Sequence, residues 1–185
     1  MNALAFEILP SPSSNDHEVR IRIDGEDWLG KDYMCIDPPV FFAQKSLTEG
    51  GELLVGRCNC GCEGCDDVWV NSVKADKEVL WTNAKGLRLH FDREAYDKLI
   101  CSASQDFSWE DTNRTAERLV SKVFQGILLD GGYSFAWASA RVETGMMALS
   151  FNKSGKQQLL KFAWNGQKPE QALLDAKRFK EETFS

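Results

Sequence analysis

The sequence has few of the residues and motifs on which enzymes and nucleic-acid-binding proteins usually depend. Only 2 of its 185 residues are histidines, and it contains no Walker A loop, no GxGxxG after a strand, no GxSxG and no HExxH segment. Neither half has a basic stripe of lysine and arginine, so we expect no direct binding to nucleic acid. These absences favour a non-enzymatic protein.

Long apolar runs are also absent. No stretch approaches the roughly 18 apolar residues of a membrane span, so no membrane segment is expected. The amino-terminal residues MNALAFEILPSPSS lack a basic region and a long apolar core, so they do not resemble a secretory signal. We therefore expect a cytoplasmic location. In that compartment the thiols of the 6 cysteines stay reduced.

The charge is distributed unevenly along the chain. Residues 1–107 carry 11 Lys+Arg against 19 Asp+Glu, a balance of −8, whereas residues 108–185 carry 11 against 9, a balance of +2. An acidic surface can simply keep a protein soluble, and it also suits a basic protein partner. The carboxylates expected to bind such a partner are Asp24, Glu26, Asp27, Asp32, Asp37, Glu63, Asp66 and Asp67.

Alternation of apolar and polar residues predicts strands in the first half. Val19, Ile21 and Ile23 alternate with charged residues, which predicts a strand with one covered face, and Asp24-Gly25 predicts the turn after it. Asp92 is the expected cap of a helix over 93–101. Further strands are expected at 52–58, 67–73, 78–82 and 87–91, and a long loop at 30–51, where Pro38-Pro39 and Gly50-Gly51 occur.

The second half begins with the strongest amphipathic pattern in the chain. Its apolar stripe runs from Ala116 to Leu128 at helical spacing, and the opposite polar face includes Arg114 and Glu117. We expect this stripe to form part of the core.

Three strands separated by short turns should follow as an antiparallel meander, before a last helix that begins at Pro169. These strands are expected at 133–141, 146–151 and 157–164. Since no βαβ rhythm is present, we predict an α+β fold of mostly antiparallel sheet, with one long amphipathic helix and a C-terminal helix. Residues 1–107 and 108–185 are the predicted halves of one compact domain.

Four of the cysteines fall within eight residues and suggest a zinc site. They are Cys58, Cys60, Cys62 and Cys65, and thiolates are ligands that Zn²⁺ prefers. Structural zinc usually takes its second ligand pair from a distant segment, and no second CxxC or HxxxH occurs here. His90 is therefore a further candidate ligand, as is His17. Cys35 and Cys101 are isolated and expected to be buried.

Two other interpretations of the cysteine cluster remain open. The neighbouring carboxylates Glu63, Asp66 and Asp67 should raise the pKa of a thiol, which argues against a nucleophilic or redox role. A glycine-rich bend with small thiols buried beneath it needs no metal at all. From the sequence alone, this structural interpretation is the one we favour.

The segment Cys58-x-Cys60-Gly61-x-x-Gly64-Cys65, followed by a β-rich stretch that ends at Leu80-Trp81, resembles uncharacterised bacterial proteins that carry a CxCGxxGC segment. The resemblance covers about residues 50–82. It implies a bacterial cytoplasmic protein and no particular activity. Because Cys62 falls on a variable position of the segment, the resemblance implies that Cys58, Cys60 and Cys65 act together.

Three hypotheses about function follow. The leading one is a non-enzymatic protein that binds a basic partner through its acidic face, by analogy with immunity proteins that neutralise cationic nuclease toxins. The second is a zinc-binding structural or sensing module built on the cysteine cluster. The third is an enzyme whose site forms only in the folded chain.

Overall fold

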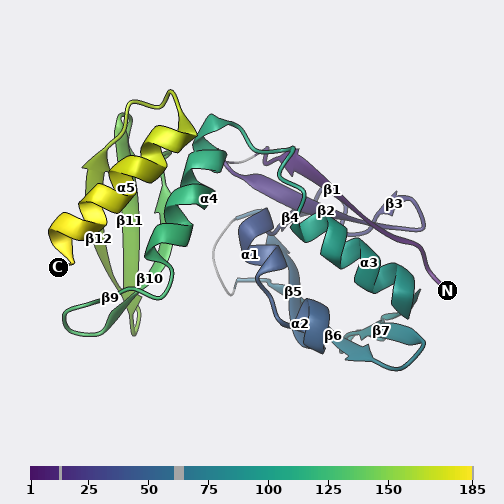
Figure 1. Cartoon of the computed structure of the whole chain (residues 1–185). Helices are drawn as coiled ribbons and strands as arrows, with labels where there is room; N and C mark the ends of the chain where they lie inside the picture. The colour runs from purple at the N-terminus through teal and green to yellow at the C-terminus, as the bar shows by residue number, and fades with distance from the viewer. Residues whose placement is uncertain (13, 61–64, 185) are drawn as a thin grey trace. The chain divides into compact units, whose positions relative to one another are not determined.

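The structure, a computed structural model, describes residues 1–12, 14–60 and 65–184. Within these residues the chain forms five helices and twelve strands, and all the strand pairs are antiparallel (Figure 1). The predicted α+β class is confirmed. No helix in the described part of the chain is long and apolar enough to cross a membrane.

The chain divides into two compact units, Met1–Trp109 and Glu110–Ser185. This division lies two residues beyond the one expected from charge and helix content. That the two units pack as one domain stays a prediction.

The first unit contains two sheets and three helices. One sheet has the strand order β1-β2-β3 and the other β4-β5-β6-β7-β8. Strand β1, which the sequence patterns did not indicate, pairs along its whole length with β2. The elements are β1 (Leu4–Pro10), β2 (His17–Ile23), β3 (Glu26–Asp27), β4 (Tyr33–Cys35), α1 (Pro38–Phe42), α2 (Ser46–Glu49), β5 (Gly51–Cys58), β6 (Val68–Lys74), β7 (Glu78–Thr82), β8 (Arg88–Asp92) and α3 (Arg93–Ser104).

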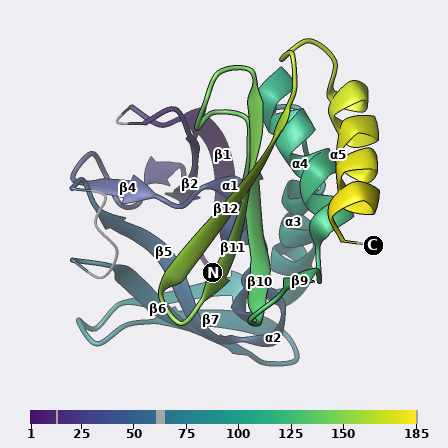
Figure 2. The same cartoon turned by 90° about the vertical axis from the view of Figure 1, so that its left-hand side faces the viewer.

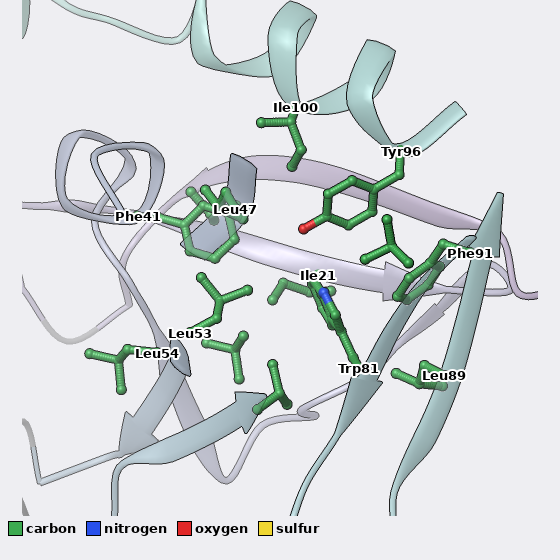
Figure 3. Close-up of a cluster of buried hydrophobic side chains, with 14 of the residues drawn as sticks. Ile21, Phe41, Leu47, Leu53, Leu54, Trp81, Leu89, Phe91, Tyr96 and Ile100 are labelled. Carbon is green, nitrogen blue, oxygen red and sulfur yellow. The ribbon is translucent and has the colours of Figure 1, made fainter. Parts of the chain in front are cut away.

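Aliphatic side chains and a group of aromatic rings fill the core of this unit (Figure 3). Trp81 of β7 is fully buried, and its ring centroid lies 5.1 Å from that of Phe91 and 6.0 Å from that of Tyr96. Tyr96 is held in place by α3, which begins where the Asp92 carboxylate accepts a hydrogen bond from the backbone N–H of Ala95 at 2.9 Å. The predicted cap is therefore confirmed, and it positions the aromatic cluster.

The prediction of a loop over 30–51 is wrong. The stretch contains β4, α1 and α2, and it contributes Phe41 and Leu47 to the core, both nearly inaccessible to solvent. Pro38 and Pro39 occupy the first turn of α1. Backbone N–H groups in the first turn have no acceptor within the helix, so the missing N–H of proline costs no hydrogen bond there. Proline here begins a short helix, whereas the sequence pattern suggested a chain without regular structure.

Both faces of β2 are covered, although only one was expected to be. Val19, Ile21 and Ile23 face the apolar core, and on the other side Glu18 and Arg20 are less than a tenth exposed. Burial of these charged side chains is possible because they pair with groups on the segment that follows the hairpin.

In the second unit, two helices cover one face of a single sheet with the order β12-β11-β10-β9 (Figures 1 and 2). The predicted meander is confirmed, and Phe124, Phe135 and Phe151 meet in the core between the helices and the sheet. The elements are α4 (Thr112–Phe124), β9 (Leu128–Leu129), β10 (Tyr133–Ser139), β11 (Met146–Lys153), β12 (Lys156–Ala163) and α5 (Pro169–Thr183).

The amphipathic helix α4 ends earlier than its apolar stripe predicts. Gly126 has a φ of +80°, which breaks the helix, and Leu128 begins β9 with 66% of its surface exposed. A positive φ is cheap for glycine and costly for other residues, so the glycine outweighs the helical spacing of the residues around it.

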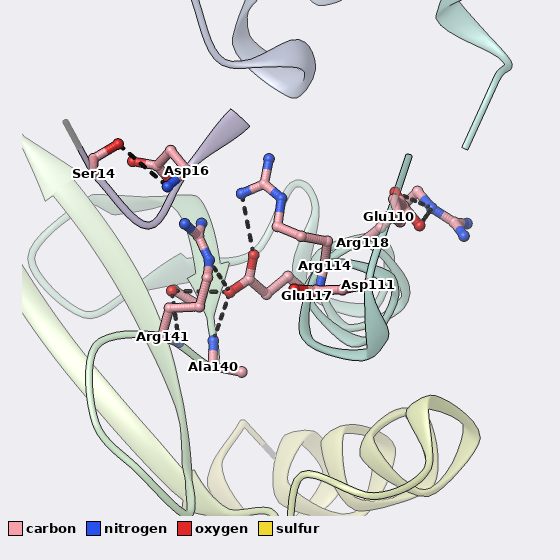
Figure 4. A network of polar contacts seen from close by, with 10 residues as sticks. Ser14, Asp16, Glu110, Asp111, Arg114, Glu117, Arg118, Ala140 and Arg141 are labelled. Carbon is pink, nitrogen blue, oxygen red and sulfur yellow. Dashed lines mark hydrogen bonds and ion pairs between the residues drawn. The ribbon is translucent and has the colours of Figure 1, made fainter. Parts of the chain in front are cut away.

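Arg114 and Glu117, assigned to the polar face of this helix, are buried. Glu117 Oε1 accepts hydrogen bonds from the Ala140 backbone N–H at 2.8 Å and from Arg141 Nε at 2.9 Å (Figure 4). Its Oε2 lies 3.3 Å from Arg114 Nη1. The carboxylate thus ties α4 to the segment after β10, which helical periodicity alone does not reveal.

Candidate metal centre

Three thiols converge where β5 ends and the chain turns toward β6. The Sγ atoms of Cys58, Cys60 and Cys65 all lie within 4.8 Å of one another. Cys58 is partly buried, whereas Cys60 and Cys65 are exposed, and none of the three forms a disulfide. The interpretation of the cluster as thiols buried beneath a bend is therefore wrong for two of its members.

The separation of these sulfurs is close to what a metal ion requires. Zn–S bonds of about 2.3 Å at the tetrahedral angle place two ligand sulfurs about 3.8 Å apart. The three side chains need to draw in by no more than about 1 Å to reach this distance. The donor set is made of soft sulfur ligands, which suits Zn²⁺ and does not suit Mg²⁺ or Ca²⁺.

Strand β4 supports the loop that carries the cluster. Tyr33 pairs with Cys58 in the β4–β5 ladder, and its hydroxyl lies 3.4 Å from the Asp66 carboxylate. On the other side of the turn, Asn59 Nδ2 donates a hydrogen bond to the Lys31 carbonyl at 2.7 Å. The described ends of the loop are both anchored to the same short strand and to the residues before it.

The absence of a side chain at Gly56 allows β5 to lie close to β4 and to the segment before β4. A Cβ atom at this position would lie 2.6 Å from Leu29 Cδ1 and 3.1 Å from the Met34 carbonyl oxygen. Only glycine fits without displacement of these neighbours. Gly56 therefore helps to set the path of the strand that delivers Cys58 to the cluster.

Contact among the thiols changes their acidity. Hydrogen bonds with Cys60 and Cys58 raise the pKa of Cys65 to about 12. A thiol that keeps its proton is a poor nucleophile near neutral pH. A metal ion that binds Cys65 must displace this proton, and the ion's own charge favours the thiolate.

The other predicted ligands are not in this cluster. Cys62 and Glu63 lie outside the described residues. His90 lies on β8, separated from β5 by β6 and β7, about 14 Å away at the ordinary strand spacing. Its Nδ1 is 3.0 Å from Glu78 Oε2. His17 packs its ring against Trp109 at a centroid distance of 5.0 Å.

The two isolated cysteines differ from each other. Cys35 is buried as expected, and burial raises the pKa of its thiol to about 11. Cys101, on α3, is exposed, so its predicted burial is wrong. It occupies the solvent side of a helix whose core side chains are Tyr96 and Ile100.

Several of the acidic residues proposed for partner binding already have partners within the chain. Asp27 forms an ion pair with Arg20 at 2.5 Å, and Asp67 Oδ1 lies 3.9 Å from Arg57 Nε. Asp24 accepts hydrogen bonds from the amino-terminal segment, which lower the pKa of its carboxyl group. These carboxylates hold the fold together as well as adding negative charge.

Other members of the acidic set are open to solvent. Glu26, Asp32 and Asp66 are exposed, whereas Asp37 is partly buried at the start of α1. The β4–β5 pairing places the neighbourhood of Asp32 beside the loop that carries Asp66. The acidic segment around Asp32 and the acidic segment around Asp66 therefore lie on the same side of the first unit.

A groove with a volume of about 730 Å³ lies between α4 and α5 in the second unit. It is lined by Lys122, Val123, Leu173, Lys177, Lys180, Glu181 and Phe184. Three of these residues are lysines and one is a glutamate, so the groove is cationic.

Sequence reasoning found the three converging cysteines and missed the groups that support them. Tyr33 and Lys31 belong to the stretch predicted as a loop, and no local pattern indicates that this stretch pairs with β5. Comparison of the chain with protein-family models, with curated proteins and with solved structures gives no match.

Proposed function

We propose that Cys58, Cys60 and Cys65 bind a zinc ion that organises the connection between β5 and β6, in a structural or sensing role. The convergence of three sulfur atoms within 4.8 Å of one another is the observation that carries this proposal. Thiols gathered on a surface loop gain little from packing, since two of the three are exposed. Their convergence supports a role as metal ligands.

The surroundings of the cluster favour a cation. The exposed carboxylate of Asp66 and the ion pair of Arg57 with Asp67 lie on the chain that borders the site. Three thiolates and Zn²⁺ carry a net charge of −1. Zinc normally takes a fourth ligand, for which Cys62 in a structural site and water in an open site are the two candidates.

Replacement of Cys65 by serine is expected to abolish stoichiometric zinc binding. The wild-type protein, purified without a chelator or an affinity-tag metal, should contain about one zinc per chain. Loss of a contact that only supports a ligand weakens metal affinity by about 10–100-fold, and loss of a ligand itself should weaken zinc affinity by more than that. Elemental analysis and competition with a chromogenic chelator measure both quantities.

Cys101→Ser is the matched control, because Cys101 is also exposed and free but has no thiol within the cluster. This variant should bind zinc as the wild-type protein does. A zinc content below about 0.2 per chain in the wild type, with thermal stability unchanged by a chelator, would contradict the proposal.

A second candidate function is the binding of a basic protein partner through the acidic face. The observation that favours it is the meeting of the two acidic segments across the β4–β5 pair, where Asp32 and Asp66 are both exposed. Charge complementarity of this kind mainly accelerates association and weakens as salt rises.

Asp32→Lys is expected to slow association with such a partner about tenfold or more at low salt. Glu182→Lys makes the same change of charge on the exposed face of α5 and should have little effect. The partner is isolated by pull-down from the source cells, and association rates are then measured at low and high salt. Equal effects of the two variants, or rates that do not depend on salt, would refute an acidic docking face.

A further inference from the structure

We propose that the same cysteine cluster is an oxidation site, at which hydrogen peroxide converts Cys65 and one of its two neighbours, Cys58 or Cys60, into a disulfide when no metal is bound. This inference rests on the proposed zinc site, since it makes the zinc-bound and the disulfide forms alternatives to each other. The observation behind it is the geometry of the thiols: the Sγ atoms of two exposed cysteines and a partly buried one lie within 4.8 Å of one another.

Cys65 is the member of the cluster that must take part in the bond. A disulfide between Cys58 and Cys60 would close a ring across a single intervening residue, and the geometry of the S–S bond strains so small a ring. Cys65 lies five residues beyond Cys60 and seven beyond Cys58 in the sequence, so either bond to it closes a longer loop. The sulfurs are already within 4.8 Å, so little further loss of chain entropy is needed.

The reaction proceeds in two balanced steps. One thiol attacks the peroxide, its S–H bond and the O–O bond break, and an S–OH group and a water molecule form. The second thiol then attacks the sulfenic sulfur, the S–OH bond breaks, the S–S bond forms and a second water molecule leaves. Two thiols lose two electrons and two protons in all, and the peroxide is reduced to water.

The acidic surroundings should slow oxidation of the thiols, but they do not change which two thiols form the disulfide. Whichever thiol attacks the peroxide first, the Sγ atom of a second thiol already lies within 4.8 Å of the oxidised sulfur. Asp67 is partly neutralised by Arg57, so the loop is less negative than its sequence suggests. Proximity, which makes the second step intramolecular, decides the product.

Elsewhere in the chain the described cysteines lack this arrangement. Cys35 is buried, so peroxide reaches it poorly. Burial also raises the pKa of its thiol to about 11. Cys101 is exposed, but it lies outside the group of three thiols. It should stop at the sulfenic acid or react with a second molecule.

Bound zinc should slow the reaction, because coordination to the cation withdraws electron density from each sulfur and fixes its position, which makes it a weaker nucleophile toward the peroxide. Conversely, formation of the disulfide removes two ligands and releases the ion. Zinc binding and oxidation therefore compete for the same sulfur atoms.

The test treats the metal-free and zinc-loaded full-length protein with an equimolar amount of hydrogen peroxide. Free thiols, zinc release to a chromogenic chelator and the linked peptides are measured after each time interval. The metal-free wild type should lose two free thiols per chain and yield a peptide pair that contains Cys65, reversibly on addition of dithiothreitol. Zinc-loaded protein should react at least about tenfold more slowly and release its ion as the disulfide forms.

Three variants sharpen the result. Cys65→Ser should form no intramolecular disulfide, and Cys101→Ser should behave as the wild type. Cys62, which lies outside the described residues, is tested in the same way. Cys62→Ser should still form the disulfide, which would exclude Cys62 as its essential partner. Zinc binding without any disulfide overturns this inference and leaves the proposed function standing. A failure to bind zinc, measured before peroxide is added, overturns both. A disulfide that forms equally fast with and without zinc refutes the competition alone.

Discussion

Replacement of Arg20 by alanine is expected to destabilise the first unit by about 3–5 kcal/mol, the usual cost of removing one partner from a buried charged network. The Arg20 guanidinium contacts the Asp27 carboxylate at 2.5 Å, the Gly30 carbonyl at 2.5 Å and the Tyr33 carbonyl at 3.0 Å. Glu18, also buried, lies 3.7 Å from it. Alanine leaves two carboxylates and two carbonyl groups without this cation.

The measurement is urea denaturation followed by circular dichroism, with Arg22→Ala as the matched control. Arg22 lies two residues along the same strand and forms an ion pair with Glu7 at 2.6 Å, but both side chains are well exposed. Solvent screens such a pair, so the midpoint of unfolding should hardly move. Equal shifts in the two variants would show that burial of Arg20 does not matter.

The same substitution is expected to affect the proposed zinc site at Cys58, Cys60 and Cys65. Arg20 holds the carbonyls of Gly30 and Tyr33, and Tyr33 pairs with Cys58. Loss of the guanidinium should loosen β4 and weaken zinc binding even under conditions in which the protein stays folded. The strand that carries no predicted ligand thus contributes to the site through its backbone.

The elements that the sequence predicts correctly are those with local causes. Alternation marks β8, where Leu89 and Phe91 face the core, and the Asp92 carboxylate caps α3 by accepting a hydrogen bond from the backbone N–H three residues ahead. Short polar turns likewise indicate the meander of the second unit. Each of these signals depends on residues within a few positions of one another.

The predictions that fail concern burial of polar groups, which depends on partners far along the chain. Arg20 and Glu117 appear on polar faces when a single strand or helix is considered. Their burial is stabilised by Asp27, by the carbonyls near β4, and by Arg141 and the backbone N–H of Ala140. Nothing in the periodicity of β2 or α4 indicates these contacts.

The candidate site shows the same division. Cys58, Cys60 and Cys65 lie close together in the sequence, and the resemblance to proteins with a CxCGxxGC segment implies that they act together. In the structure their Sγ atoms lie within 4.8 Å of one another. The inclusion of His90 required knowledge of the strand order, because β8 lies three strands away from β5. Ligands close in sequence can be predicted from spacing, whereas ligands from other strands require the topology.

Replacement of Trp81 by alanine is the second substitution with a large expected effect, a loss of about 3–5 kcal/mol in the stability of the first unit. Trp81 is fully buried and contacts the rings of Phe91, Tyr96 and Trp28, with centroids 5.1, 6.0 and 6.1 Å away. Phe91 belongs to β8 and Tyr96 to α3 (Figure 3), whereas Trp28 belongs to the segment after β3. The rings are therefore held by separate parts of the chain, which limits how far they can move inward to fill the space that the indole leaves.

Trp69→Ala on the neighbouring strand is the control for the indole itself. Trp69 is 46% exposed, so its loss creates no cavity and should shift the denaturation midpoint only slightly. Trp81→Phe retains an aromatic ring and should fall between wild type and alanine, which keeps the comparison informative if the alanine variant does not fold. Stability should fall in the order wild type, Trp81→Phe, Trp81→Ala. A different order would contradict a core built around this residue, because cavity size would then not determine the loss of stability.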